Sequence, residues 1–267
     1  RIYNNINAVA TQSTLGLTNS RMQKSLERLS TGMRINRSSD DAAGLSVSEG
    51  LRSQIRGSGM AQRNANDGLA MLQIAESGTQ QITDSLQRMR ELAIQAANGT
   101  YTNTAAEHNQ EYTALASEIT RIATATSYNG VQLLSTATAF SFQISSAKSG
   151  SSSTISFTPT DLSTGLSFGG VSSQSAAQSA ISSIDTILAS VLSLRSNIGS
   201  TMNRLDATVS NLGNMITNLT DAESRIRDTD FAQETMQFTR NQILTQSATS
   251  MMSQANQLPS GVLNLLR

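Results

Sequence analysis

Apolar residues recur at heptad spacing near the start of the chain. Ala8 begins a series of positions seven apart, and two further apolar residues supply the alternate positions. Steps of three and four residues keep such side chains on one side of an α-helix. The pattern predicts an amphipathic helix that needs a partner along an apolar seam of Leu15, Met22, Leu26, Leu29 and Met33.

A similar four–three pattern closes the chain. Between the two ends the apolar spacing predicts two much longer helices, one over about residues 41–97 and one that begins near Gln174. Asp40 and Asp41 precede the first long helix, where a carboxylate oxygen can accept the unpaired N–H groups of the first turn. The seam predicted for the last helix consists of Leu244, Ala248, Met251, Ala255, Leu258, Val262 and Leu265.

The middle of the chain follows a different pattern. Phe140, Phe142 and Ile144 alternate with polar residues, and so do Ile155 and Phe157. A period of two indicates half-buried strands. The surrounding residues are rich in Ser, Thr and Gly, which predicts a small β-hairpin insertion with loops and no second large domain.

These patterns predict a mainly α fold, in which the N- and C-terminal regions pair as long antiparallel coiled-coil helices around a small β-hairpin insertion. The termini carry opposite charge, because residues 1–37 hold six basic groups and one acid, whereas Asp228, Asp230 and Glu234 outnumber Arg240 in residues 228–260. We expect a terminal coiled coil from residues 1–37 and 226–267, a helical rod from residues 38–130 and 176–225, and the insertion at residues 131–175.

Composition and charge argue against several functional classes. The Lys+Arg and Asp+Glu counts are equal, at 19 each, so no net charge attracts nucleic acid. The sequence contains no Cys, which excludes disulfides and thiolate metal sites, and no stretch approaches the ~18 consecutive apolar residues of a membrane span. We therefore expect neither nucleic-acid binding nor membrane insertion.

The sequence also lacks the side chains for common catalytic sites. His108 is the only histidine, which precludes a His-Glu-x-x-His zinc site and a Ser-His-Asp triad. Asp40 and Asp41 form a carboxylate pair, but helix capping explains them more simply than acid–base work does. We expect a structural protein with no catalytic, cofactor-binding or metal-binding residues, and not an enzyme.

Several longer motifs resemble a known family. Residues 30–36, Ser-Thr-Gly-Met-Arg-Ile-Asn, followed by Asp-Asp-Ala-Ala-Gly at 40–44, resemble the N-terminal signature of bacterial flagellin, the subunit of the flagellar filament. Residues 222–232 resemble its C-terminal signature, and residues 254–257 resemble its terminal motif. The resemblance covers residues 1–135 and 175–267, so the family's large variable outer domains are missing.

The resemblance implies a secreted, extracellular subunit that polymerises with itself into the filament used for motility. The terminal helices would line a central channel, and the longer helices would form the surrounding rod. Type III export, a chaperone on the C-terminal helix, a filament cap and hook-junction proteins are implied as well. The alternative is a hook–filament junction protein, although complete signatures at both ends favour flagellin.

The resemblance also implies a receptor site. An innate Toll-like receptor recognises many flagellins through positions that correspond here to Arg88, Leu92, Gln95 and Glu111. We therefore expect these residues to contact that receptor.

Overall fold

The structure is a computed structural model that describes residues 5–98, 105–146, 153–162 and 168–265, with only the helical course given for 258–265. The chain forms two compact units. Unit 1 contains Arg1–Gln54 and Asn218–Arg267, and unit 2 contains Ile55–Thr217. Helices α2 (Ala42–Ala96) and α4 (Gln174–Arg227) each contribute to both units.

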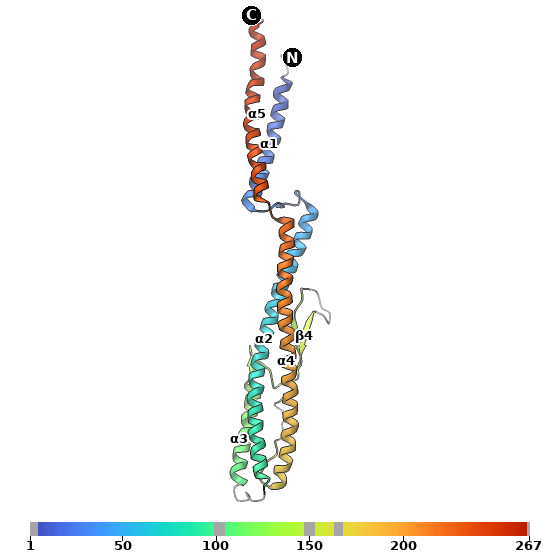
Figure 1. Ribbon diagram of the computed structural model, residues 1–267, viewed down its shortest axis with the longest axis vertical. Helices are drawn as coiled ribbons and strands as arrows, with labels where there is room; N and C mark the ends of the chain where they lie inside the picture. The colour runs from blue at the N-terminus through green and yellow to red at the C-terminus, as the bar shows by residue number, and fades with distance from the viewer. Residues whose placement is uncertain (1–4, 99–104, 147–152, 163–167, 266–267) are drawn as a thin grey trace. The chain divides into compact units, whose positions relative to one another are not determined.

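Unit 1 is built around the two terminal helices. Helices α1 (Ile6–Thr31) and α5 (Phe231–Leu265) lie side by side and antiparallel (Figure 1). The Asn5 side chain caps α1 by accepting from the N–H of Ala8 at 3.2 Å, and its amide donates to the carbonyl oxygen of Ala255 at 2.7 Å. Gly32 ends α1 in the left-handed conformation, with φ 71°. The predicted pairing of the chain's two ends is confirmed.

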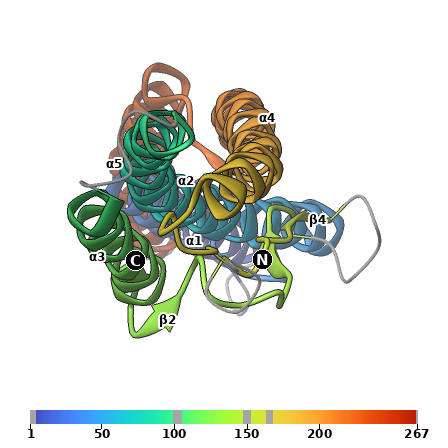
Figure 2. The same ribbon diagram turned by 90° about the horizontal axis from the view of Figure 1, so that it is seen from below.

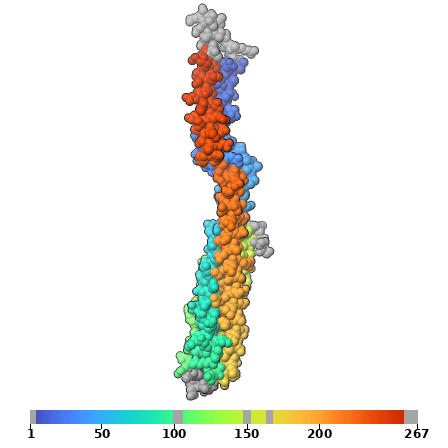
Figure 3. All heavy atoms as spheres, viewed as in Figure 1, coloured from blue at the N-terminus to red at the C-terminus, as the bar shows by residue number. Residues whose placement is uncertain are grey.

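Unit 2 has a helical core. The remaining parts of α2 and α4 pack with α3 (Ala105–Ala125), as seen along their axes in Figure 2, and α2 and α4 lie side by side along one face in Figure 3. Apolar residues seven positions apart on α4 are buried and form a seam. They include Ile184, Val191, Ile198 and Leu205. Their partners from α2 and α3 include Ile82, Leu86, Met89, Tyr112 and Ile119, all fully buried.

Two small antiparallel hairpins complete unit 2. Strands β3 (Phe140–Gln143) and β4 (Thr154–Phe157) pair with Phe140 opposite Phe157, which confirms the predicted insertion. Strands β1 (Ser127–Tyr128) and β2 (Val131–Gln132) flank a two-residue turn. Asn129 and Gly130 adopt φ values of 50° and 79° there, as a tight hairpin turn with the right twist requires.

Three glycines of α2 let the segments around β1–β4 approach the helix backbone. A Cβ atom on Gly57 would lie 2.5 Å from the Cβ of Ser146, and one on Gly68 would lie 2.9 Å from the Phe142 ring. One on Gly78 would lie 2.7 Å from the Thr126 hydroxyl. Because these glycines have no side chains, the segments around β1–β4 can pack directly against the backbone of α2.

Alanine at Gly68 is expected to destabilise unit 2, because the rigid Phe142 ring must shift away from the new methyl group. Overpacking of this kind costs about 1–3 kcal/mol. Gly59 offers a matched control in the same helix, since a Cβ there meets nothing within 4 Å. Gly59→Ala should raise stability by about 0.5–1 kcal/mol through its better helix propensity. Thermal unfolding followed by circular dichroism checks both, and equal effects would contradict the packing role of Gly68.

Two features of helix α4 concern its end and its hydropathy. It continues through charged residues to Arg227, and only residues 228–230 separate it from α5. By length and composition alone, α4 is also apolar enough to cross a bilayer, with a mean hydropathy of 1.3 in its most apolar stretch. About a third of that stretch is buried within the chain, and the buried residues of α4 include the seam of unit 2.

Candidate assembly surface on the terminal helices

A backbone clasp joins the end of α1 to the start of α5. Met33 pairs with Asp228 in an isolated antiparallel bridge. The N–H of Arg34 donates to the carbonyl oxygen of Arg227 at 2.6 Å, and the N–H of Thr229 donates to that of Gly32 at 2.9 Å. We call residues 32–34 and 227–229 the clasp. Because it holds both helix ends in register, the clasp fixes which faces of α1 and α5 meet.

Ion pairs surround the clasp. Lys24 Nζ lies 2.7 Å from Asp40, and Glu49 accepts from Arg52 at 2.8 Å and from Arg227 at 2.9 Å. The hydrogen bond from Lys24 is the main cause that lowers the pKa of Asp40. The hydrogen bond from Arg52, followed by that from Arg227, lowers the pKa of Glu49.

The two candidate capping residues have different roles. Asp41 caps α2, because its carboxylate accepts from the N–H of Gly44 at 2.8 Å. Asp40 instead accepts from the N–H groups of Asn36 and Arg37, each at 3.2 Å, and so closes the loop before α2. Local backbone bonding thus accounts for both carboxylates.

Acid is expected to loosen the region around the clasp. The folded-state pKa values of Asp40 and Glu49 lie below the ordinary values of 3.8 and 4.5, so their stabilising contribution is complete above that range. It is lost as the pH falls through the lowered values. Hydrogen exchange at the amides of Arg34 and Thr229, corrected for intrinsic rates, should accelerate below about pH 4. The double variant D40N/E49Q should be loose already at neutral pH, and unchanged protection in acid would contradict this role.

Small and polar residues fill much of the seam between α1 and α5. Thr18, Ser25, Asn241 and Ala255 are buried there. Six of the predicted seam residues are at least half-buried, namely Leu15, Met22, Leu29, Met33, Ala248 and Ala255. Arg28 and Glu234 add an ion pair at 3.5 Å across the two helices. The predicted opposite charges therefore do meet.

Other predicted seam residues lie outside this pair. Leu26 is 57% exposed. Thr18 and Ser25, which stand three residues after Leu15 and Met22, are buried in the seam instead. Leu244 and Met251 are also exposed. Leu258, Val262 and Leu265 lie on the last turns of α5, where side chains fall outside the described part of the chain. Leu26 therefore lies outside the contact between α1 and α5, and its place in an assembly seam stays a prediction.

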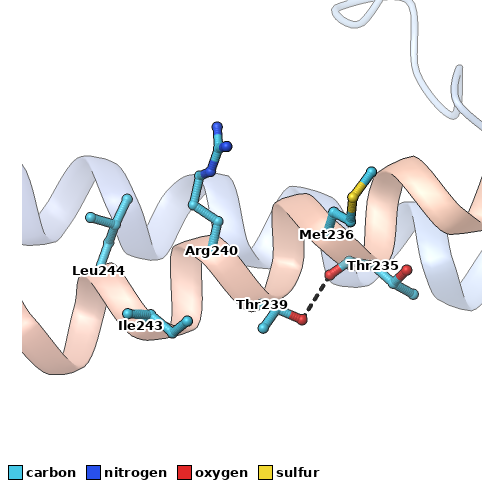
Figure 4. A pocket seen from close by; sticks show the side chains of 6 residues that line it. All are labelled: Thr235, Met236, Thr239, Arg240, Ile243 and Leu244. Atoms are coloured by element: carbon cyan, nitrogen blue, oxygen red, sulfur yellow. Dashed lines mark hydrogen bonds between the residues drawn. The ribbon is translucent and has the colours of Figure 1, made fainter.

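An apolar stripe instead runs along the outside of α5. We define the α5 stripe as Met236, Ile243, Leu244 and Met251, which are 47–67% exposed. At about 100° per residue, these positions fall within about 100° of arc on the helix. Three of them line an open groove of about 490 Å³ together with Thr235, Thr239 and Arg240 (Figure 4). The heptad pattern did not predict Met236 and Ile243. Their spacing to Leu244 and Met251 nevertheless places all four on one side of a helix.

Exposed apolar residues also occur on α1. Ile6, Val9 and Leu17 are 53–66% exposed and share one side of the helix. Large contiguous apolar surfaces on a monomer mark interaction sites, because water disfavours them. The α1–α5 pair therefore combines a modest internal seam with apolar outer faces that are suited to a further partner.

Comparison with known proteins identifies the kind of partner. Residues 2–139 match the family model for the bacterial flagellin N-terminal helical region, and residues 181–266 match that for the C-terminal helical region. The chain belongs to the bacterial flagellin family. Flagellins form the flagellar filament by polymerising with themselves. The exposed apolar faces of α1 and α5 are therefore found on a member of a self-assembling family of structural proteins.

Relatives within the flagellin family match along the full chain. A flagellin from Halalkalibacterium halodurans is 44% identical over 271 residues, and flagellin FlaB2 from Treponema pallidum is 41% identical over 284. Both alignments cover 100% of this chain and 99% of the relative. These two flagellins therefore match the chain over its whole length.

Solved structures show the same fold. The crystal structure of Bacillus cereus flagellin is 31% identical, has a TM-score of 0.50, and covers 56% of this chain and 88% of that one. A putative flagellar hook-associated protein from Vibrio parahaemolyticus has a TM-score of 0.60 over 71% of this chain and 100% of its own. Its identity is only 16%, so it supports the fold alone.

The residues expected at the receptor site lie in unit 2. Arg88 donates to Glu111 at 2.9 Å and to Glu91 at 3.2 Å, and this network is exposed. Gln95 is exposed on the same helix, whereas Leu92 is only 1% exposed and packs in the core. The structure thus leaves Arg88, Gln95 and Glu111 accessible, whereas burial in the core does not fit the direct receptor contact expected of Leu92.

Proposed function

We propose that this chain is a structural subunit of a bacterial flagellar filament and that a second copy covers the α5 stripe during assembly. Membership in the flagellin family establishes the filament role. The exposure of Met236, Ile243, Leu244 and Met251 on a folded helix carries the assignment of the contact surface.

The energetics support assembly through this surface. Full burial of a Leu, Ile or Met side chain contributes about 1.5–3 kcal/mol, so four such residues supply a substantial part of a subunit contact. The α1–α5 seam is rich in Thr, Ser, Asn and Ala, which bury less apolar area. A second copy would therefore add the apolar burial that the pair lacks within one chain.

Seeded assembly followed by electron microscopy tests this function. The full chain should give long tubular filaments, and variants lacking residues 1–37 or 244–267 should give none. Circular dichroism should show that the shortened chains keep the helices of unit 2. Amorphous product from the full chain would contradict the proposal. Short capped assemblies that never elongate would indicate the hook–filament junction alternative.

We propose further that the chain has no enzymatic activity and reaches the outside of the cell through type III export. A chaperone would guard α5 before assembly, since a groove on another protein can hold the apolar face of a helix. That chaperone and a second copy would compete for the α5 stripe. Growth would take place under a cap protein, beyond hook-junction proteins.

The Toll-like flagellin receptor is the last partner that we propose. The accessible ion-pair network of Arg88 with Glu91 and Glu111, next to exposed Gln95, supports such a contact on the monomer. Leu92 would act from beneath by holding α2 in place. Arg88→Ala combined with Gln95→Ala should weaken monomer binding, and normal binding of that variant would overturn the proposal.

A further inference from the structure

The only readily oxidised sulfur in this chain is that of methionine. The sequence holds ten Met and no Cys. Met236 and Met251 are the most exposed of them, at 67% and 66%, followed by Met60 at 50% and Met215 at 40%. By contrast, Met71 and Met89 are buried in unit 2 at 6% and 0%. A small oxidant dissolved in water therefore reaches Met236 and Met251 first.

The two most exposed methionines lie at the ends of the α5 stripe. They stand fifteen positions apart in the sequence, which is about 22 Å along a helix. Ile243 and Leu244 lie between them on the same face. Met236 also lines the groove of about 490 Å³ in which Figure 4 shows it together with Ile243 and Leu244. Any change in polarity at these two sulfurs changes both ends of the proposed contact surface.

We propose that Met236 and Met251 form an oxidation-sensitive site that controls assembly. Conversion of their thioethers to sulfoxides by a peroxide in the monomer keeps that copy out of the filament. This inference rests on the proposed role of the α5 stripe as the surface that a second copy covers.

The chemistry requires only the protein and a peroxide. A lone pair on the thioether sulfur attacks one oxygen of hydrogen peroxide, and the O–O bond breaks as the new S–O bond forms. The departing hydroxide takes the proton from the transferred oxygen and leaves as water. The sulfur loses two electrons and the peroxide gains them. The product is a polar, chiral sulfoxide in place of a flexible apolar group.

A sulfoxide is poorly matched to burial on this surface. Its oxygen needs a hydrogen-bond donor when water is removed. The hydroxyls of Thr235 and Thr239 already donate to backbone carbonyl oxygens, at 2.7 Å and 2.9 Å, so among the residues that line the groove Arg240 is the side chain left to donate to a sulfoxide at Met236. Burial would strip water from both sulfoxide oxygens and remove the apolar contacts of the thioethers, which should raise the critical concentration for assembly about tenfold to hundredfold.

Assembly should in turn protect the two methionines. Once a second copy covers the α5 stripe, peroxide no longer reaches the sulfur atoms. Met60 and Met215, which lie outside the stripe, serve as internal references within the same molecule. Sulfoxide formation at Met236 and Met251 should therefore slow sharply in filaments relative to monomers.

Three full-length proteins test the proposal, namely the unmodified chain, M236L/M251L and M60L/M215L. Leucine matches methionine in volume and does not form a sulfoxide, so each variant should fold, and its critical concentration without peroxide is measured first as its own reference. Each monomer is treated with graded hydrogen peroxide. Peptide mass spectrometry then gives the sulfoxide fraction at each methionine, and sedimentation gives the critical concentration for assembly.

We expect peroxide to raise the critical concentration of the unmodified chain and of M60L/M215L by at least tenfold, in step with the sulfoxide at Met236 and Met251. The same treatment should leave the critical concentration of M236L/M251L at its own untreated value. Equal loss in M236L/M251L, or normal assembly of chains fully oxidised at both positions, would overturn the inference. Failure of untreated, unmodified chain to form filaments would instead contradict the proposed function.

Discussion

Aspartate at both Ile243 and Leu244 is expected to abolish filament formation while leaving the monomer folded. Both side chains are exposed on the α5 stripe, at 60% and 47%, so the monomer loses little packing. In an assembled contact the change removes about 3–6 kcal/mol of apolar burial and adds two carboxylates to a surface without water. The critical concentration should rise by more than about a hundredfold, which sedimentation measures directly.

A matched control lies on another face of the same helix. Gln242 and Gln246 are exposed and occupy neither the α5 stripe nor the seam with α1. The variant Q242D/Q246D adds the same charge to α5 at nearly the same position along the helix axis. If it assembles normally while I243D/L244D does not, the α5 stripe is the cause. Equal loss in the two variants would mean that charge on α5, and not its apolar stripe, decides assembly.

Alanine at Leu86 is expected to produce the largest loss of stability in unit 2. Leu86 is fully buried in the core cluster shared by α2, α3 and α4. Large-to-small changes at such positions cost about 2–5 kcal/mol, because apolar burial is lost and a cavity remains. The midpoint of thermal unfolding should fall by about 5–15 °C. Far-ultraviolet circular dichroism is the suitable probe, since the chain has no Trp.

Gln87 provides the control for Leu86, because it is the next residue of α2 and is exposed. Gln87→Ala should leave the unfolding midpoint almost unchanged, and it should improve helix propensity slightly. A small effect of Leu86→Ala, comparable to that of Gln87→Ala, would show that the core described for unit 2 does not hold its helices together in solution.

The sequence pattern predicted the long helices well, because each carries many turns of consistent spacing. The helix expected over residues 41–97 is observed as Ala42–Ala96, and the helix expected from Gln174 begins there. The alternation at Phe140 and Phe142 likewise predicted β3. These features depend on local chemistry, and local chemistry can be read from a single sequence.

The face that α1 turns toward α5 was harder to predict. Hydrophobicity alone favoured Leu26, but the clasp sets a register in which Thr18 and Ser25 face inward. Their small side chains allow close approach of the helices, and a hydropathy pattern gives them no weight. A contact such as Met33 with Asp228 joins residues far apart in the chain, so no local pattern could reveal it.

The candidate surface shows the same division. Leu244 and Met251 were predicted as seam residues, yet they lie on the outer stripe of α5 and not in the seam with α1. Two four–three patterns overlap on this helix, one through Asn241, Thr245 and Met252 and one through Leu244 and Met251. The sequence could not decide which of them faces α1, because that choice depends on the register of the pair.

A density map of the assembled filament at side-chain detail would show directly what covers the α5 stripe. We expect Met236, Ile243, Leu244 and Met251 of each copy to be covered by a neighbouring copy of the chain. A map in which these four side chains face solvent or an open channel, with neighbouring copies in contact elsewhere, would contradict it.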